Sequence, residues 1–101
     1  MEAEGFFNEA LQGRQRELGP DHPETLETKN DLAVLYMQQA RYDKAEPLLR
    51  QAVEGRTERL GPQHPHTLTS IRNLIKLYEA WGKPQQAEQW RAKLPDAETA
   101  K

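Results

Sequence analysis

Two segments of this 101-residue chain are nearly identical, and they begin 42 positions apart. Residues 18–26 read Leu-Gly-Pro-Asp-His-Pro-Glu-Thr-Leu, and residues 60–68 read Leu-Gly-Pro-Gln-His-Pro-His-Thr-Leu. Other positions recur at the same spacing, so that Tyr36 is repeated as Tyr78. Self-similarity at a fixed period indicates stacked structural units, because one such unit cannot bury its apolar face alone. The sequence therefore predicts a repeat protein whose function lies on a repeated surface.

The same offset also divides the chain into units. Ala3, Ala10 and Gly13 recur as Ala45, Ala52 and Gly55, so the first residues correspond to the second half of a unit. We expect one domain over residues 1–95, made of a half-repeat at 1–19, a repeat at 20–61 and a capping repeat at 62–95. A helix is expected upstream of the half-repeat. A frayed tail is expected at 96–101, since Pro95 precedes small and polar residues.

The last unit carries the signs of a cap. A terminal repeat has no successor to cover it, so its outer face is expected to be polar. Residues of this kind cluster at 85–93, namely Gln85, Gln86, Gln89, Arg91 and Lys93. Trp90 is expected to close the inner side of this unit, and Pro95 is expected to stop its helix.

Apolar residues follow a helical spacing throughout the chain. They form stripes with a 3.6-residue period at about 23–39 and 42–59. Gly19-Pro20 and Gly61-Pro62 are typical helix stops, whereas Pro23 and Pro65 suit the first turn of the next helix. No stretch alternates with a period of two, and the links within units are short, which favours antiparallel neighbours. An all-α fold of about five helices is predicted.

Composition excludes several classes of function. The net charge of −2 argues against a general nucleic-acid or anionic-membrane binder, and no run of apolar residues is long enough to span a membrane. No cysteine is present, and His22, His64 and His66 lack the spacing of metal ligands. Ser70 is the only serine and has no nucleophile motif around it. We therefore expect a cytoplasmic protein that is not an enzyme, without catalytic residues, cofactor or metal. The His-Pro steps at His22 and His64 are expected to cap the next helix, with the imidazole bonding locally.

The packing positions resemble those of tetratricopeptide repeats, in particular the 42-residue kind found in kinesin light chains and many bacterial multidomain proteins. The large, small and aromatic positions of that family correspond to Leu32, Ala33 and Tyr36 in the first helix of the whole repeat. The resemblance covers about residues 2–94. It implies a right-handed α-solenoid of antiparallel helix pairs with two and a half repeats. Ile75 and Arg91 depart from the family pattern, which wants a small residue at the first position and a bulky core residue at the second.

The resemblance also implies a function, which is non-catalytic binding of a peptide or partner segment. In such arrays the first helices of successive repeats line a concave groove. Here the implied contact residues are Asn30, Asp31, Val34, Met37, Gln38, Arg72, Asn73 and Lys76. Arg72 and Lys76 could hold an acidic segment. An equally open alternative is that both pair with Asp31 and Glu27 across the stacked helices.

Two further hypotheses stay open. Phe6, Phe7 and Leu11 form an apolar surface that a preceding helix would cover, so the half-repeat could carry self-association into a homo-oligomer as part of an assembly. The chain could also be a regulatory arm of a larger multidomain enzyme.

Overall fold

Five α-helices make up most of the molecule. The computed structural model describes residues 2–95, and the expected tail at 96–101 lies outside them. The helices are α1 (Glu2–Leu18), α2 (Pro23–Gln38), α3 (Tyr42–Leu60), α4 (Pro65–Ala80) and α5 (Pro84–Arg91). Residues 2–95 contain no β-strand. The all-α prediction is confirmed, with the number of helices that the repeat pattern indicated.

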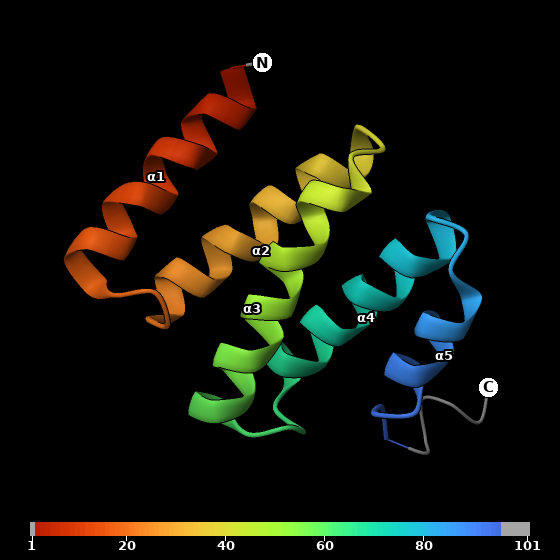
Figure 1. Cartoon of the computed structure of the whole chain (residues 1–101). Helices are drawn as coiled ribbons and strands as arrows, with labels where there is room; N and C mark the ends of the chain where they lie inside the picture. The colour runs from red at the N-terminus through yellow and green to blue at the C-terminus, as the bar shows by residue number, and fades with distance from the viewer. Residues whose placement is uncertain (1, 96–101) are drawn as a thin grey trace.

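The helices stack side by side in the order in which they occur in the chain (Figure 1). Successive helices run in opposite directions. α2 packs between α1 and α3, and α4 packs between α3 and α5. The first helices of the two units, α2 and α4, also contact each other. The result is an α-solenoid in which each helix is stabilised mainly by its immediate neighbours.

The connectors start the helices in the same way in both units. His22 and His64 precede α2 and α4 in an extended conformation, with φ/ψ of −62°/143° and −65°/141°. In each case Nδ1 of the imidazole accepts a hydrogen bond of 3.1 Å from the backbone N–H two residues later, at Glu24 or His66. This bond satisfies one of the open donors at a helix start. The expectation that these histidines bond locally as helix caps is confirmed.

The helix stops are also repeated. Gly19 and Gly61 follow α1 and α3 with φ of +94° and +98°, a backbone region that residues with a Cβ rarely adopt. The N–H of each glycine donates to a carbonyl four residues earlier, at Gln15 or Thr57. A glycine at this position therefore ends one helix and turns the chain toward the next.

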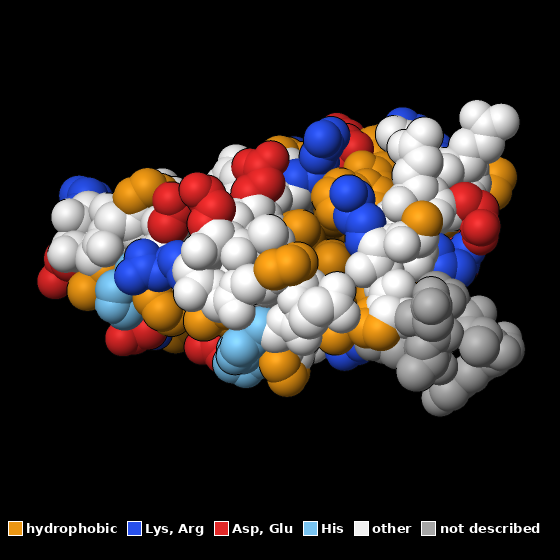
Figure 2. Space-filling view, turned by 90° about the horizontal axis from the view of Figure 1, so that it is seen from below, with side chains coloured by type: hydrophobic (Ala, Val, Ile, Leu, Met, Phe, Trp, Pro, Cys, Tyr) orange, Lys and Arg blue, Asp and Glu red, His pale blue; other side chains and the backbone are white. Residues whose placement is uncertain are grey.

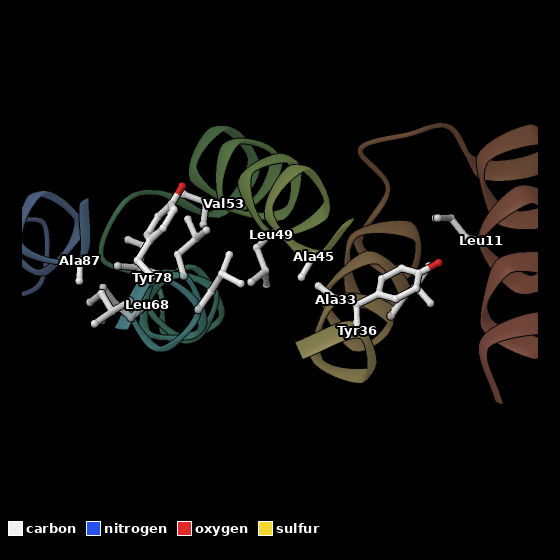
Figure 3. Close-up of a cluster of buried hydrophobic side chains, with 14 residues drawn as sticks. Leu11, Ala33, Tyr36, Ala45, Leu49, Val53, Leu68, Tyr78 and Ala87 are labelled. Carbon is white, nitrogen blue, oxygen red and sulfur yellow. The ribbon is translucent and has the colours of Figure 1, made fainter. Parts of the chain in front are cut away.

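Buried side chains from all five helices form one continuous core (Figure 3). Small residues are among the most buried, since Ala33, Ala45 and Ala52 are fully buried. Larger side chains fill the remaining space between the helices. They include Leu32, Leu49, Leu74, Leu77 and Tyr78. The core is therefore a seam along the stack, as expected for repeats that bury their faces against one another.

Two tyrosines bond across the contact between successive units. The Tyr36 hydroxyl on α2 donates to Oε2 of Glu4 on α1 at 3.3 Å, and the Tyr78 hydroxyl on α4 donates to Oε2 of Glu46 on α3 at 2.5 Å. Burial and the adjacent Glu46 carboxylate raise the pKa of Tyr78 to about 12. This bond is a repeated element, because each pair lies 42 positions after the one before.

The last unit ends differently from the first. Its second helix, α5, ends at Arg91, although Pro95 was expected to be the stop. The backbone N–H groups of Lys93 and Leu94 donate to the carbonyls of Trp90 and Arg91, so a tight turn follows the helix at once. Arg91 stands one period after the buried Leu49, and it pairs instead with Glu79 and Glu88. A charged residue that keeps its head group near solvent thus replaces a core residue here.

Two glycines one period apart provide a test of this packing. A Cβ added at Gly55 would lie 2.7 Å from a terminal methyl group of Leu26, which is fully buried, whereas a Cβ at Gly13 would meet nothing within 4 Å. Gly13→Ala should raise the free energy of unfolding by about 0.5–1 kcal/mol, because alanine favours the helix. Gly55→Ala should lower it by about 1–3 kcal/mol through overpacking. Urea unfolding followed by circular dichroism measures both, and a gain from Gly55→Ala would contradict the structure.

Candidate functional site

The expected contact residues lie on two neighbouring helices. Asn30, Asp31, Val34, Met37 and Gln38 are on α2, and Arg72, Asn73 and Lys76 are on α4. The structure brings the two sets together, because Nδ2 of Asn73 donates to Oδ1 of Asn30 at 3.2 Å. Figure 1 shows α2 and α4 sloping in the same direction, with α3 packed against both.

Asn30 lies below the surface at the contact between these helices. Only 8% of it is exposed. Its Oδ1 accepts hydrogen bonds of 3.2 Å from both Oγ of Ser70 and Nδ2 of Asn73. The structure therefore assigns Asn30 a role in linking one repeat to the next, which the sequence had not indicated.

A buried arginine completes this polar link. Nη1 of Arg56 on α3 donates to Oγ of Ser70 at 2.8 Å and to the carbonyl oxygen of His66 at 3.1 Å. One period earlier, Arg14 on α1 donates to Oγ1 of Thr28 on α2. An arginine of each second helix thus bonds to a hydroxyl of the next first helix. In the sequence, these arginines directly follow the repeated glycines Gly13 and Gly55, but their role requires the structure to be seen.

Acidic residues near the middle of α2 interact with arginines of the neighbouring helices. Burial raises the pKa of the Asp31 carboxyl, and the neighbouring Glu27 raises it further, while Arg56 and Arg14 oppose this shift. Burial also lowers the pKa of Arg56, against the attraction of Glu27 and Asp31. Although the residue as a whole is exposed, its carboxyl is partly buried, and this partial burial is the main cause of the shift. The acidic residues on α2 therefore face the arginines of α1 and α3.

The remaining residues of the expected groove are open to solvent to different degrees. Gln38 and Lys76 are exposed, and Val34 and Met37 are half-buried. Arg72 is half-buried, and its Nη2 donates to Oγ1 of Thr69 at 3.4 Å. Within residues 4–95 no ion pair involves Lys76, so its predicted pairing with Glu27 or Asp31 is not found there. We use the name α2–α4 surface for seven residues, which are Asp31, Val34, Met37, Gln38, Arg72, Asn73 and Lys76.

The apolar residues at the N-terminal end differ in exposure. Phe6 is 70% exposed, and its ring meets that of Phe7 edge-on at 5.9 Å between centroids. Phe7 is half-buried against the core, and Leu11 is part of the core because α2 covers it. Of the three residues considered for self-association, Phe6 is the one that the structure leaves on the surface.

The described residues hold no cluster of metal ligands and no helix long and apolar enough to cross a membrane. Ser70 is buried, and its hydroxyl is engaged by Arg56 and Asn30. Figure 2 views the face that carries the connectors, where the histidine side chains appear at separate places and acidic and basic side chains are intermixed. Hydrophobic side chains lie among the charged ones on this face.

Comparisons with known proteins place this arrangement among helical repeats. The tetratricopeptide repeat model matches residues 1–58 and 27–91. The crystal structure of BtubC (BKLC) from P. vanneervenii superposes with a TM-score of 0.77 at 22% sequence identity, over 87% of this chain and 36% of that one. The chain thus spans about a third of the length of that protein. No curated protein matches it.

Asn30 allows the link between repeats to be tested. Asn30→Ala removes the acceptor of Ser70 and Asn73 at a buried position, so the free energy of unfolding should fall by about 1–3 kcal/mol. Gln38→Ala is the control on the same helix, where an exposed side chain should change it by less than about 0.5 kcal/mol. Thermal and urea unfolding measure both variants. Equal effects would contradict a linking role for Asn30.

The ionisation of Asp31 gives a test that depends on pH. Its pKa should lie above the usual value of about 3.9, and Glu27→Gln should lower it by removing a like charge. The folded state then holds this proton more tightly than the unfolded state, so stability due to Asp31 falls as pH rises from about 3.9 through the folded pKa. The ¹³C shift of the Asp31 carboxyl reports the pKa. Asp43→Asn, in the first turn of α3, is the control and should leave the pKa of Asp31 unchanged.

Proposed function

The chain belongs to the tetratricopeptide-repeat family, and from that membership we propose that it is a protein-interaction module that holds an acidic partner segment on the α2–α4 surface. Repeats of this family generally mediate contacts between proteins. The structural likeness to BtubC supports the fold alone, so the partner class has to be argued from the residues themselves.

The observation that carries the proposal is the joining of two first helices into one surface. The Asn30–Asn73 bond joins α2 to α4, so a partner on this surface would contact side chains of both helices. Arg72 and Lys76 supply positive charge from α4, and Asn73 supplies an amide, while Val34 and Met37 on α2 supply partly exposed apolar area. A partner segment fits such a surface if its carboxylates accept hydrogen bonds from the cationic groups and a small apolar side chain lies beside them.

The proposed binding is non-covalent. A rigid surface that is held by neighbouring helices loses little conformational entropy when a segment docks, which favours recognition of an extended chain. A second candidate is self-association, and the observation that favours it is the exposure of the Phe6 ring.

The experiment uses a fluorescein-labelled, amidated dodecapeptide in which one leucine is flanked by four aspartates. We expect Arg72→Glu with Lys76→Glu to weaken its binding at least about tenfold in fluorescence anisotropy, since two attractive charges become repulsive. Lys44→Glu with Arg50→Glu makes the same change of charge on α3, outside this surface, and should alter the affinity less than about twofold. Binding should also weaken as salt is added.

Two outcomes would count against the α2–α4 surface. An equal loss in both double variants would mean that the peptide senses net charge only. Absence of peptide binding, together with a sedimentation coefficient that depends on concentration and is reduced by Phe6→Ser, would favour self-association instead.

A further inference from the structure

A hollow lies between the second helices of the two units. Its volume is about 590 Å³, and it is bounded by the later half of α3, the connector, the first turns of α4 and the end of α5. The apolar side chains that line it are Val53, Ile71 and Trp90, together with Pro62 of the connector. None of the residues of the α2–α4 surface lines it. A hollow of this size is within the range that accepts a small ligand or a large side chain.

Departures from the repeat create this hollow. One period before Ile71 the chain has Lys29, which is 3% exposed and extends from α2 so that its Nζ donates to the carbonyl oxygen of Pro20 at 3.2 Å. Isoleucine is shorter and cannot reach the equivalent connector residue, Pro62. In addition, α5 ends at Arg91, whereas α3 continues to Leu60. The second unit therefore lacks two features that fill and cover the corresponding place in the first.

The border of the hollow carries an unbalanced charge. Glu54 and Glu58 lie one turn apart on α3, are exposed and line the hollow. No ion pair involves either of them within residues 4–95. Like charges at this spacing on a helix repel each other, so a cation between them would relieve the repulsion. Lys93 lies on the border as well, with its Nζ 5.4 Å from the centroid of the Trp90 ring.

We propose that this hollow binds a partner segment that presents one bulky apolar side chain beside a lysine or arginine. The apolar side chain would enter between Val53, Ile71 and Trp90, where an aromatic ring gains most from burial. The neighbouring cation would lie against Glu54 and Glu58. This preference is opposite in charge to that proposed for the α2–α4 surface, so the two sites would select different segments. An experiment can therefore contradict one proposal without contradicting the other.

The test uses two acetylated and amidated heptapeptides with a central phenylalanine, which is flanked by lysines in one and by glutamates in the other. The chain has two tryptophans; Trp90 lines the hollow, while Trp81 directly follows α4 and stacks on Tyr78. In ¹⁵N spectra of the full chain the indole signal of Trp90 should shift with the lysine peptide and that of Trp81 should not. The glutamate peptide should bind at least about tenfold more weakly.

Variants assign this binding to the hollow. Ile71→Lys introduces at the base of the hollow the lysine that the first unit has at the equivalent position. This variant should abolish the shift of the Trp90 indole signal. Glu54→Lys with Glu58→Lys changes only exposed residues and should reverse the preference between the peptides. Glu9→Lys with Glu17→Lys makes the same change of charge on α1 and should leave the preference unchanged.

The proposal is overturned if the two peptides bind equally, if both indole signals move together, or if the α1 variant reverses the preference as the α3 variant does. It is also overturned if, in the free chain, nuclear Overhauser contacts join the Trp90 indole to the methyl groups of Ala97, Thr99 or Ala100. The occupant would then be the end of this chain.

Discussion

Each first helix of this molecule is held between two second helices, and the rest of the structure depends on that contact. α2 is covered by α1 and α3, and α4 is covered by α3 and α5. A single helix pair would leave one apolar side open, so a repeat of this kind becomes stable only when a neighbour closes it. The fully buried alanines at these contacts allow the helices to approach closely, and therefore a larger side chain at such a position would disturb two units at once.

Polar bonds give this apolar stack its register. The tyrosine hydroxyls bond to Glu4 and Glu46 on one side of the seam, and arginines of the second helices bond to Thr28 and Ser70 elsewhere along it. Apolar contact alone would tolerate sliding of one helix past another, whereas a buried hydrogen bond is lost when its partners move by a fraction of an ångström. Since both kinds of bond recur every 42 residues, each unit is aligned with the next by the same means.

Most of the fold could be predicted from the sequence, because local signals decide it. The His-Pro steps predicted the helix starts, the Gly-Pro steps predicted the stops, and the apolar spacing predicted the buried faces.

Features that depend on distant neighbours could not be predicted. Asn30 reads as a surface residue until Ser70 and Asn73 are brought to it, and Leu11 reads as exposed until α2 covers it. The end of α5 at Arg91 was also missed, since Pro95 was the only local stop signal, while the pairing of Arg91 with Glu79 requires the fold. Which side chains of the α2–α4 surface contact a partner stays a prediction.

The position of α3 has a consequence for how the chain would act among other proteins. Its Arg56 supports the link between α2 and α4, while Val53, Glu54 and Glu58 border the hollow beside α5. α3 therefore contacts both helices that carry the α2–α4 surface and also borders the hollow, so under the two proposals one helix, about 10 Å across, adjoins two sites of opposite charge preference. Two ligands bound on either side would be held within a short, fixed separation, and a rigid separation of that kind raises the effective concentration of one ligand for the other. The smallest unit of this solenoid would then be a bivalent adaptor rather than a single receptor.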